Sequence, residues 1–116
     1  MRLIGSVLSV VLSIIAGPVM AEAPATPVVT LILKDHRFSP AAFTVPAGRK
    51  VKIILVNQDA ATEEFDSHDL KVEELVTPKG RATFSIGPLK PGVYHFMGEF
   101  HPQTAQGVVT ATPDAR

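Results

Sequence analysis

The stretch "PGVYHFMGEFHPQTAQGVV", residues 91–109, decides the fold. It contains one β-prone run at 92–97 and leads into a second at 107–112, with a short polar segment between them. The stretch has no cysteine but holds three side chains that can bind metal ions, namely Met97 at the end of the first run and Glu99 and His101 in the polar segment. The stretch therefore predicts two strands joined by a loop that carries potential metal ligands.

The rest of the chain continues the same β pattern. Short β-branched or alternating runs recur every 8–12 residues, with Pro and Gly between them, and no segment of the domain shows a helical apolar repeat. The further expected strands are 28–34, 43–45, 51–57, 69–76 and 82–86. This spacing predicts an all-β sandwich or barrel. The polar connection at 58–67 is expected to be a long loop, and such loops often carry function.

The N-terminal residues have the layout of a secretory signal peptide. Arg2 precedes an apolar run, and small residues surround an expected cleavage site after Ala21 or Ala23. We expect residues 1–21 to be the signal peptide, 22–27 a flexible Pro/Ala-rich leader, and 28–116 the folded domain. The protein is then exported, with no membrane span after removal of the signal.

Composition excludes several classes of function. The formal net charge is zero, so no phosphate-binding surface is indicated and nucleic acid is not an expected partner. With no cysteine, the domain has no disulfide, and a bound metal or a well-packed core must stabilise it. A hydrolase is not indicated, because the neighbours Ser67 and His68 would point to opposite faces of a strand.

Two histidines are candidate metal ligands. His68 and His101 each follow a carboxylate by two positions, and we expect each to lie where a strand meets a polar loop. The candidate metal site therefore comprises His68, His101, Glu99, Met97 and Asp66. Strand spacing alone does not unite these residues, because a simple meander would leave 98–101 at the opposite end from His68. His36 is expected to be a surface or loop residue, and His95 to face solvent.

These segments resemble the cupredoxins. "SHDL" (67–70) resembles the segment that supplies their first histidine ligand, and 91–109 resembles their C-terminal ligand loop. The resemblance implies a Greek-key β-sandwich, cupredoxin-like, that brings both loops to one end. It also places His101 at the second histidine position and Gly98 where the copper-binding cysteine would stand. Without a thiolate the chain cannot form a blue-copper site.

A narrower resemblance is carried by "KDHRFSP", "EEFDSHDL", "IGPLKPGVYHF" and "EFHPQTAQG". These are similar to segments of cysteine-free, cupredoxin-like periplasmic proteins associated with bacterial iron uptake systems. That resemblance implies an iron or copper ion, assistance with ferrous iron oxidation or handover by electron transfer, and a periplasmic location. The implied partners are a periplasmic iron-binding protein and an inner-membrane permease or redox partner. Two alternatives stay open: a periplasmic copper carrier that uses a Met/His site, and a metal-free interaction module.

Overall fold

The computed structural model describes residues 5, 7–18 and 25–113, and within them it contains strands and turns but no helix. The strands are β1 (Val28–Lys34), β2 (Arg37–Ser39), β3 (Ala42–Pro46), β4 (Val51–Asn57), β5 (Glu63–Ser67), β6 (Val72–Val76), β7 (Arg81–Ile86), β8 (Gly92–Gly98) and β9 (Gln106–Thr112).

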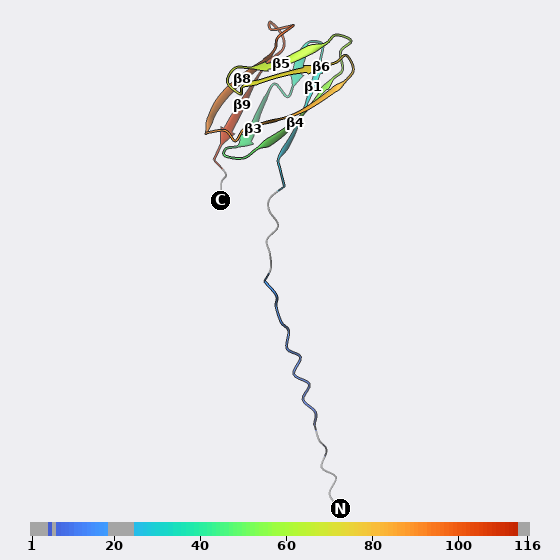
Figure 1. Ribbon diagram of the computed structural model, residues 1–116, viewed down its shortest axis with the longest axis vertical. Coiled ribbons are helices and arrows are strands. Elements are labelled where there is room, and N and C mark those ends of the chain that lie inside the picture. Colours follow the sequence, from blue (N-terminus) through green and yellow to red (C-terminus); the bar gives the residue numbers. More distant parts are fainter. Residues whose placement is uncertain (1–4, 6, 19–24, 114–116) are drawn as a thin grey trace, which may run out of the picture.

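The strands form two facing sheets (Figure 1). One has the order β2-β1-β4-β7, and the other has the order β3-β9-β8-β5-β6. The pairs β1–β4 and β3–β9 are parallel, and the remaining pairs are antiparallel. The chain changes sheet repeatedly, for example from β4 to β5 and from β6 to β7, so it is not a meander. The predicted all-β Greek-key sandwich is confirmed.

Buried and exposed side chains alternate along the strands, and the buried ones form the core. Leu31 and Leu33 of β1 and Ile53 and Leu55 of β4 are all at most 1% exposed, and they face the second sheet. Phe65 of β5 meets them from the other side and stacks on Phe96 of β8 with 4.8 Å between ring centroids. Burial of such apolar surface, at about 25 cal/mol per Å², is the main force that holds the two sheets together.

β5 corrects the expectation of a long loop at 58–67. Its side chains alternate, with Glu63, Phe65 and Ser67 buried and Glu64 and Asp66 turned outward. The segment is rich in acids and has one large apolar residue, so local propensity does not favour a strand. Its central position between β6 and β8 overrides that preference, because both of its edges are paired.

Among the described N-terminal residues, 5 and 7–18, there is no strand, and the apolar side chains are exposed. No helix among the described residues is long and apolar enough to cross a membrane. The expected cleavage site at Ala21 or Ala23 lies outside the described residues, and the signal peptide stays a prediction.

Candidate metal centre

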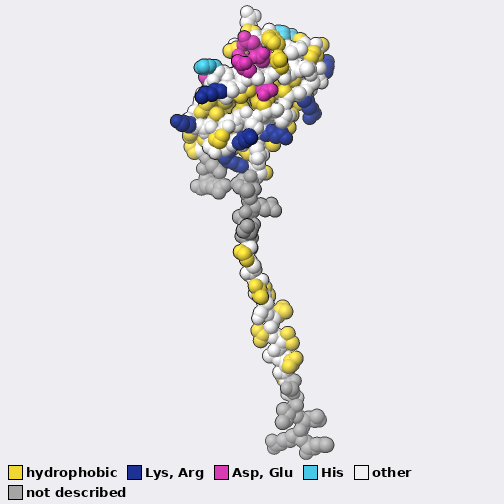
Figure 2. Space-filling view, viewed as in Figure 1, with side chains coloured by type: hydrophobic (Ala, Val, Ile, Leu, Met, Phe, Trp, Pro, Cys, Tyr) yellow, Lys and Arg dark blue, Asp and Glu magenta, His cyan; other side chains and the backbone are white. Residues whose placement is uncertain are grey.

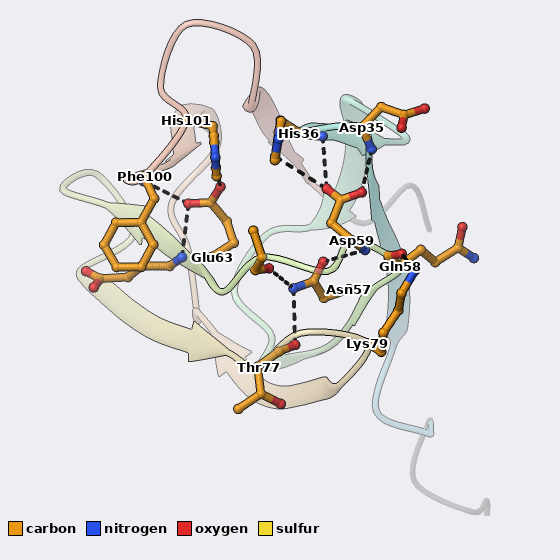
Figure 3. Close-up of polar contacts among 12 residues, drawn as sticks. Asp35, His36, Asn57, Gln58, Asp59, Glu63, Thr77, Lys79, Phe100 and His101 are labelled. Atoms are coloured by element: carbon orange, nitrogen blue, oxygen red, sulfur yellow. Dashed lines mark hydrogen bonds and ion pairs between the residues drawn. The ribbon is translucent and has the colours of Figure 1, made fainter.

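Three side chains with metal-binding atoms meet at one end of the sandwich: His36, Glu63 and His101. They come from the β1–β2 turn, the first residue of β5, and the turn that follows β8. One potential ligand atom from each lies within 4.8 Å of the others. Figure 3 shows His101 and Glu63 pointing toward each other, with His36 beside them.

Glu63 is the buried member of this His36–Glu63–His101 cluster, at 1% exposed. Its Oε1 accepts hydrogen bonds from the backbone N–H of Glu64 (3.0 Å) and of Phe100 (2.8 Å). Its Oε2 lies 2.5 Å from His101 Nδ1. These contacts hold the carboxylate beneath the two imidazoles. A buried carboxylate requires such partners, because burying it without them would be costly.

The two imidazoles stack. The ring centroids of His36 and His101 are 3.6 Å apart, and the planes are inclined by 13°. Their side chains are 42% and 29% exposed, respectively. The cluster therefore opens to solvent on its imidazole side and is closed on its carboxylate side.

His36 is positioned by its backbone. Asp35 and His36 form the two-residue turn between β1 and β2, with φ of 52° and 56°, a left-handed conformation that is uncommon for non-glycine residues but that Asp and His adopt more often than most. The Asp59 carboxylate stabilises the turn by accepting both backbone N–H groups, at 2.7 and 2.9 Å. Burial acts to raise the pKa of Asp59, but these hydrogen bonds and the nearby charges of His36 and Lys79 bring it below its usual value of 3.8.

Asp59 is in turn held by Asn57, the last residue of β4. Asn57 is 1% exposed, and its Oδ1 accepts the backbone N–H of Asp59 at 2.9 Å. Its Nδ2 donates to the carbonyls of Ala61 (2.8 Å) and Thr77 (3.1 Å). A chain of hydrogen bonds thus connects the end of β4 to the His36 turn (Figure 3).

Gly98 leaves the space that the Glu63 carboxylate occupies. A β-carbon at position 98 would lie 2.7 Å from Glu63 Cδ, 2.9 Å from Glu63 Oε2 and 2.7 Å from Ala105 Cβ. A β-carbon does not approach non-bonded atoms this closely in folded proteins, so a larger residue at 98 and the observed Glu63 conformation exclude each other. The glycine is required here for space.

The structure separates the sequence-predicted site residues. His101 belongs to the cluster. Met97 and Asp66 lie on the outer face of the five-stranded sheet, opposite each other in register, and Glu99 lies close enough to hydrogen-bond Asp66. His68 follows the far end of β5, five residues beyond Glu63, which corresponds to about 17 Å of extended strand. His68 and His101 therefore do not share a site in this structure.

The outer face carries an acidic group that includes Glu64, Asp66, Glu73 and Glu99. Figure 2 shows acidic side chains gathered over β5. A hydrogen bond with Asp66 raises the pKa of Glu99, and the charges of Asp66, Glu64 and Glu73 act in the same direction. This face therefore presents concentrated negative charge to solvent.

Two members of the cluster were not predicted as ligands. His36 was expected to be a surface or loop residue, and Glu63 lies in the polar connection at 58–67 that was expected to be a loop. One signal could have identified Glu63. The resemblance places the first ligand where a loop ends and a strand begins, and that boundary is at Glu63 rather than at His68.

These observations define a Greek-key sandwich with a cluster of nitrogen and oxygen donors at one end. The chain matches the model of the cupredoxin-like domain over residues 5–111, so it belongs to that family. It is also 43% identical over 81 residues to the uncharacterized protein RP394 of Rickettsia prowazekii (strain Madrid E). That match covers 70% of this chain and 65% of the relative, so the chain spans slightly less than two thirds of the relative's length.

Solved structures share the fold at low sequence identity. Auracyanin A, a "blue" copper protein from Chloroflexus aurantiacus, superposes with a TM-score of 0.66 at 14% identity, covering 76% of this chain and 100% of that one. A purple cupredoxin from Nitrosopumilus maritimus gives a TM-score of 0.55 at 20% identity, covering 72% and 98%. At these identities the likeness establishes the fold alone.

The family implies a copper ion, and the chemistry of the side chains in the cluster determines which kind of copper site they can form. A blue-copper centre needs a cysteine thiolate, and the chain has no cysteine. Two imidazoles and one carboxylate are nevertheless a donor set suited to Fe(II), Cu(II) or Zn(II). The cluster fits a transition-metal ion but does not fit a blue-copper site.

Proposed function

We propose that this protein is an exported metal-binding protein that holds one divalent transition-metal ion between His36, Glu63 and His101. The observation that carries the proposal is the buried Glu63 carboxylate, held by two backbone N–H groups and in contact with His101, with His36 stacked above. The cupredoxin-like fold, which indicates a copper-binding or electron-transfer protein, supports the same class of function.

The donor set favours iron or Cu(II) as the bound ion. Two histidines and one carboxylate, with other positions open, form the arrangement typical of non-haem Fe(II) centres. An anionic ligand stabilises Fe(III) more than Fe(II), so Glu63 would favour oxidation of a bound ferrous ion. The two part-exposed imidazoles provide a path from solvent, and the acidic outer face attracts cations toward the molecule.

We further propose a role in bacterial iron uptake, with oxidation or handover of ferrous iron by electron transfer. The support for this role is the sequence resemblance together with the donor set. In this proposal the protein acts in the periplasm beside a periplasmic iron-binding protein and an inner-membrane permease, and a redox partner accepts the electron. The periplasmic location rests on the predicted signal peptide at residues 1–21.

Metal loading of the purified protein tests the site. The chelator-treated protein is loaded with Cu(II) in air or with Fe(II) under anaerobic conditions, and its metal content and melting temperature are measured. We expect one ion per chain and a rise in stability of about 2.7 kcal/mol at a free metal concentration one hundred times Kd. The Glu63→Gln and His101→Gln variants should lose the bound ion and this stabilisation.

His68→Gln is the matched control, because His68 is exposed and lies at the other end of β5. It should keep the stabilisation by Fe(II) or Cu(II). If His68→Gln removes the ion while Glu63→Gln and His101→Gln retain full stoichiometry, the site lies elsewhere and the proposal fails. Equal melting temperatures with and without metal would instead support a metal-free interaction module.

A further inference from the structure

A second group of metal-binding side chains lies at the other end of β5. A groove on the outer face of the five-stranded sheet is lined by His68, His95 and Met97, together with Asp66 and Asp69. None of these five residues belongs to the His36–Glu63–His101 cluster. Three of them, His68, Met97 and Asp66, were predicted as ligands from sequence, and the structure brings these three together without His101.

Two hydrogen bonds fix His68 beside His95. Ser67 Oγ donates to the backbone carbonyl of His95 at 2.6 Å, and Asp69 Oδ2 accepts the backbone N–H of His95 at 2.8 Å. The Ser67 hydroxyl also accepts the Leu70 N–H at 2.9 Å, which closes the turn. Because His68 stands between Ser67 and Asp69, this clamp holds the backbone of the two histidines side by side.

Strand alternation places Met97 on the same face. His95 and Met97 are two residues apart on β8 and both are exposed, whereas Phe96 between them is buried. Their β-carbons are then about 7 Å apart along the strand. Asp66 pairs with Met97 across the ladder, where facing β-carbons are about 5 Å apart. Imidazole and thioether side chains are long enough to converge on one point above these positions.

We propose that His68, His95 and Met97 form a second metal site, which takes Cu(I). A thioether is a soft ligand and imidazole is borderline, so this set favours a soft monovalent ion over the hard cations that carboxylates prefer. Asp66 and its acidic neighbours supply the negative charge that attracts the cation. The proposal is independent of the site at His36, Glu63 and His101, from which β5 separates it.

Anaerobic Cu(I) titration against a competing chelator tests the site, with the methionine methyl groups labelled with ¹³C. The chain has three methionines, and the Met97→Leu variant identifies the signal of Met97. In the wild-type protein, one equivalent of Cu(I) should shift that signal. His68→Gln, His95→Gln and Met97→Leu should each weaken Cu(I) binding by about tenfold to a hundredfold.

Two controls separate this site from the first. Val93→Ala changes another exposed residue on the outer face of β8, and His101→Gln removes a ligand of the first site. Both variants should show the same Cu(I)-induced shift of the Met97 methyl signal as the wild-type protein, and the same Cu(I) affinity when that signal is followed in the titration. The proposal is overturned if Cu(I) leaves the Met97 methyl signal unmoved, or if His95→Gln binds Cu(I) as tightly as the wild-type protein. Loss of the Met97 shift in His101→Gln would also overturn it.

Discussion

At the scale of single residues, the candidate metal centre depends on the lack of a side chain at position 98, which leaves room for the side chain of Glu63. The Glu63 carboxylate occupies the volume that a side chain at 98 would need. A cupredoxin-like sandwich can therefore carry a ligand at 98 or the Glu63 carboxylate in its present place, but not both. This explains in steric terms why a glycine accompanies the carboxylate.

Gly98→Ala tests this steric relation. The added methyl group would meet Glu63 and Ala105, so we expect a loss of about 1–3 kcal/mol in unfolding free energy, as for other overpacked sites. Because the carboxylate must move, metal affinity should fall by about tenfold or more. Chemical denaturation and metal titration measure the two effects. In a Glu63→Ala background the same substitution should cost less stability, and an equal cost would show that the carboxylate is not what the methyl group meets.

Asp59 gives the turn at His36 a pH-dependent support. Its pKa is lower in the folded protein than its usual value of 3.8, chiefly because the backbone N–H groups of His36 and Asp35 stabilise the charged form against the effect of burial. A depressed folded-state pKa contributes stability above the unfolded value, and this contribution is lost as pH falls below about 3.8.

Asp59→Asn should therefore destabilise the protein by about 1–2 kcal/mol at pH 7, since two charge-assisted hydrogen bonds are weakened. It should also reduce the loss of stability that the wild-type protein shows on acidification below pH 4. Urea denaturation at a series of pH values measures both. Asp35→Asn is the control, because it changes an exposed carboxylate in the same turn. If the two variants show the same pH dependence as the wild-type protein, Asp59 does not support the turn electrostatically.

At the scale of the elements, the sequence predicts the strands with a clear apolar or β-branched pattern. β1, β4 and β8 occur where expected, because large apolar residues such as Leu31, Ile53 and Phe96 hold most of their buried positions. β5 was missed for the opposite reason, since two of its three buried positions hold Glu63 and Ser67. Their burial is tolerated through partners remote in sequence, namely the Phe100 N–H for Glu63 and the His95 carbonyl for Ser67.

The missed strand also explains the misplaced histidine. With 58–67 expected to be a loop, His68 was placed at the junction of a loop and a strand, and the resemblance to cupredoxins then placed that junction at the same end as His101. The added length of β5 moves it to the far end of that strand and puts Glu63 at the junction. Which strands pair with β5 is decided only when the chain folds, so local sequence patterns did not reveal which acid would be buried. His101 was expected where a strand meets a polar loop, and it lies in the turn after β8.

At the scale of the whole molecule, the sandwich keeps its core separate from its donor groups. The aromatic core around Phe65 and Phe96 lies between the sheets, whereas the His36–Glu63–His101 cluster lies at one end and the His68–His95–Met97 group lies on the outer face. Ligands can therefore change with little effect on the apolar contacts that stabilise the fold. The same sandwich should accept a different kind of metal centre at its cluster end.

The double variant Glu63→His with Gly98→Cys tests this idea. It removes the carboxylate that blocks position 98 and, with His101, supplies two imidazoles and a thiolate, the donor set of a blue-copper centre. We expect the variant to fold with reduced stability, because the turn must still shift at Ala105, and to develop an intense visible absorption band on addition of Cu(II). Neither single variant should show the band, since Gly98→Cys alone meets the carboxylate and Glu63→His alone lacks sulfur. A folded double variant that binds Cu(II) without visible colour would show that the backbone at 63, 98 and 101 does not have the geometry of a cupredoxin copper site. The present cluster would then differ from such a site in its backbone as well as in its ligands.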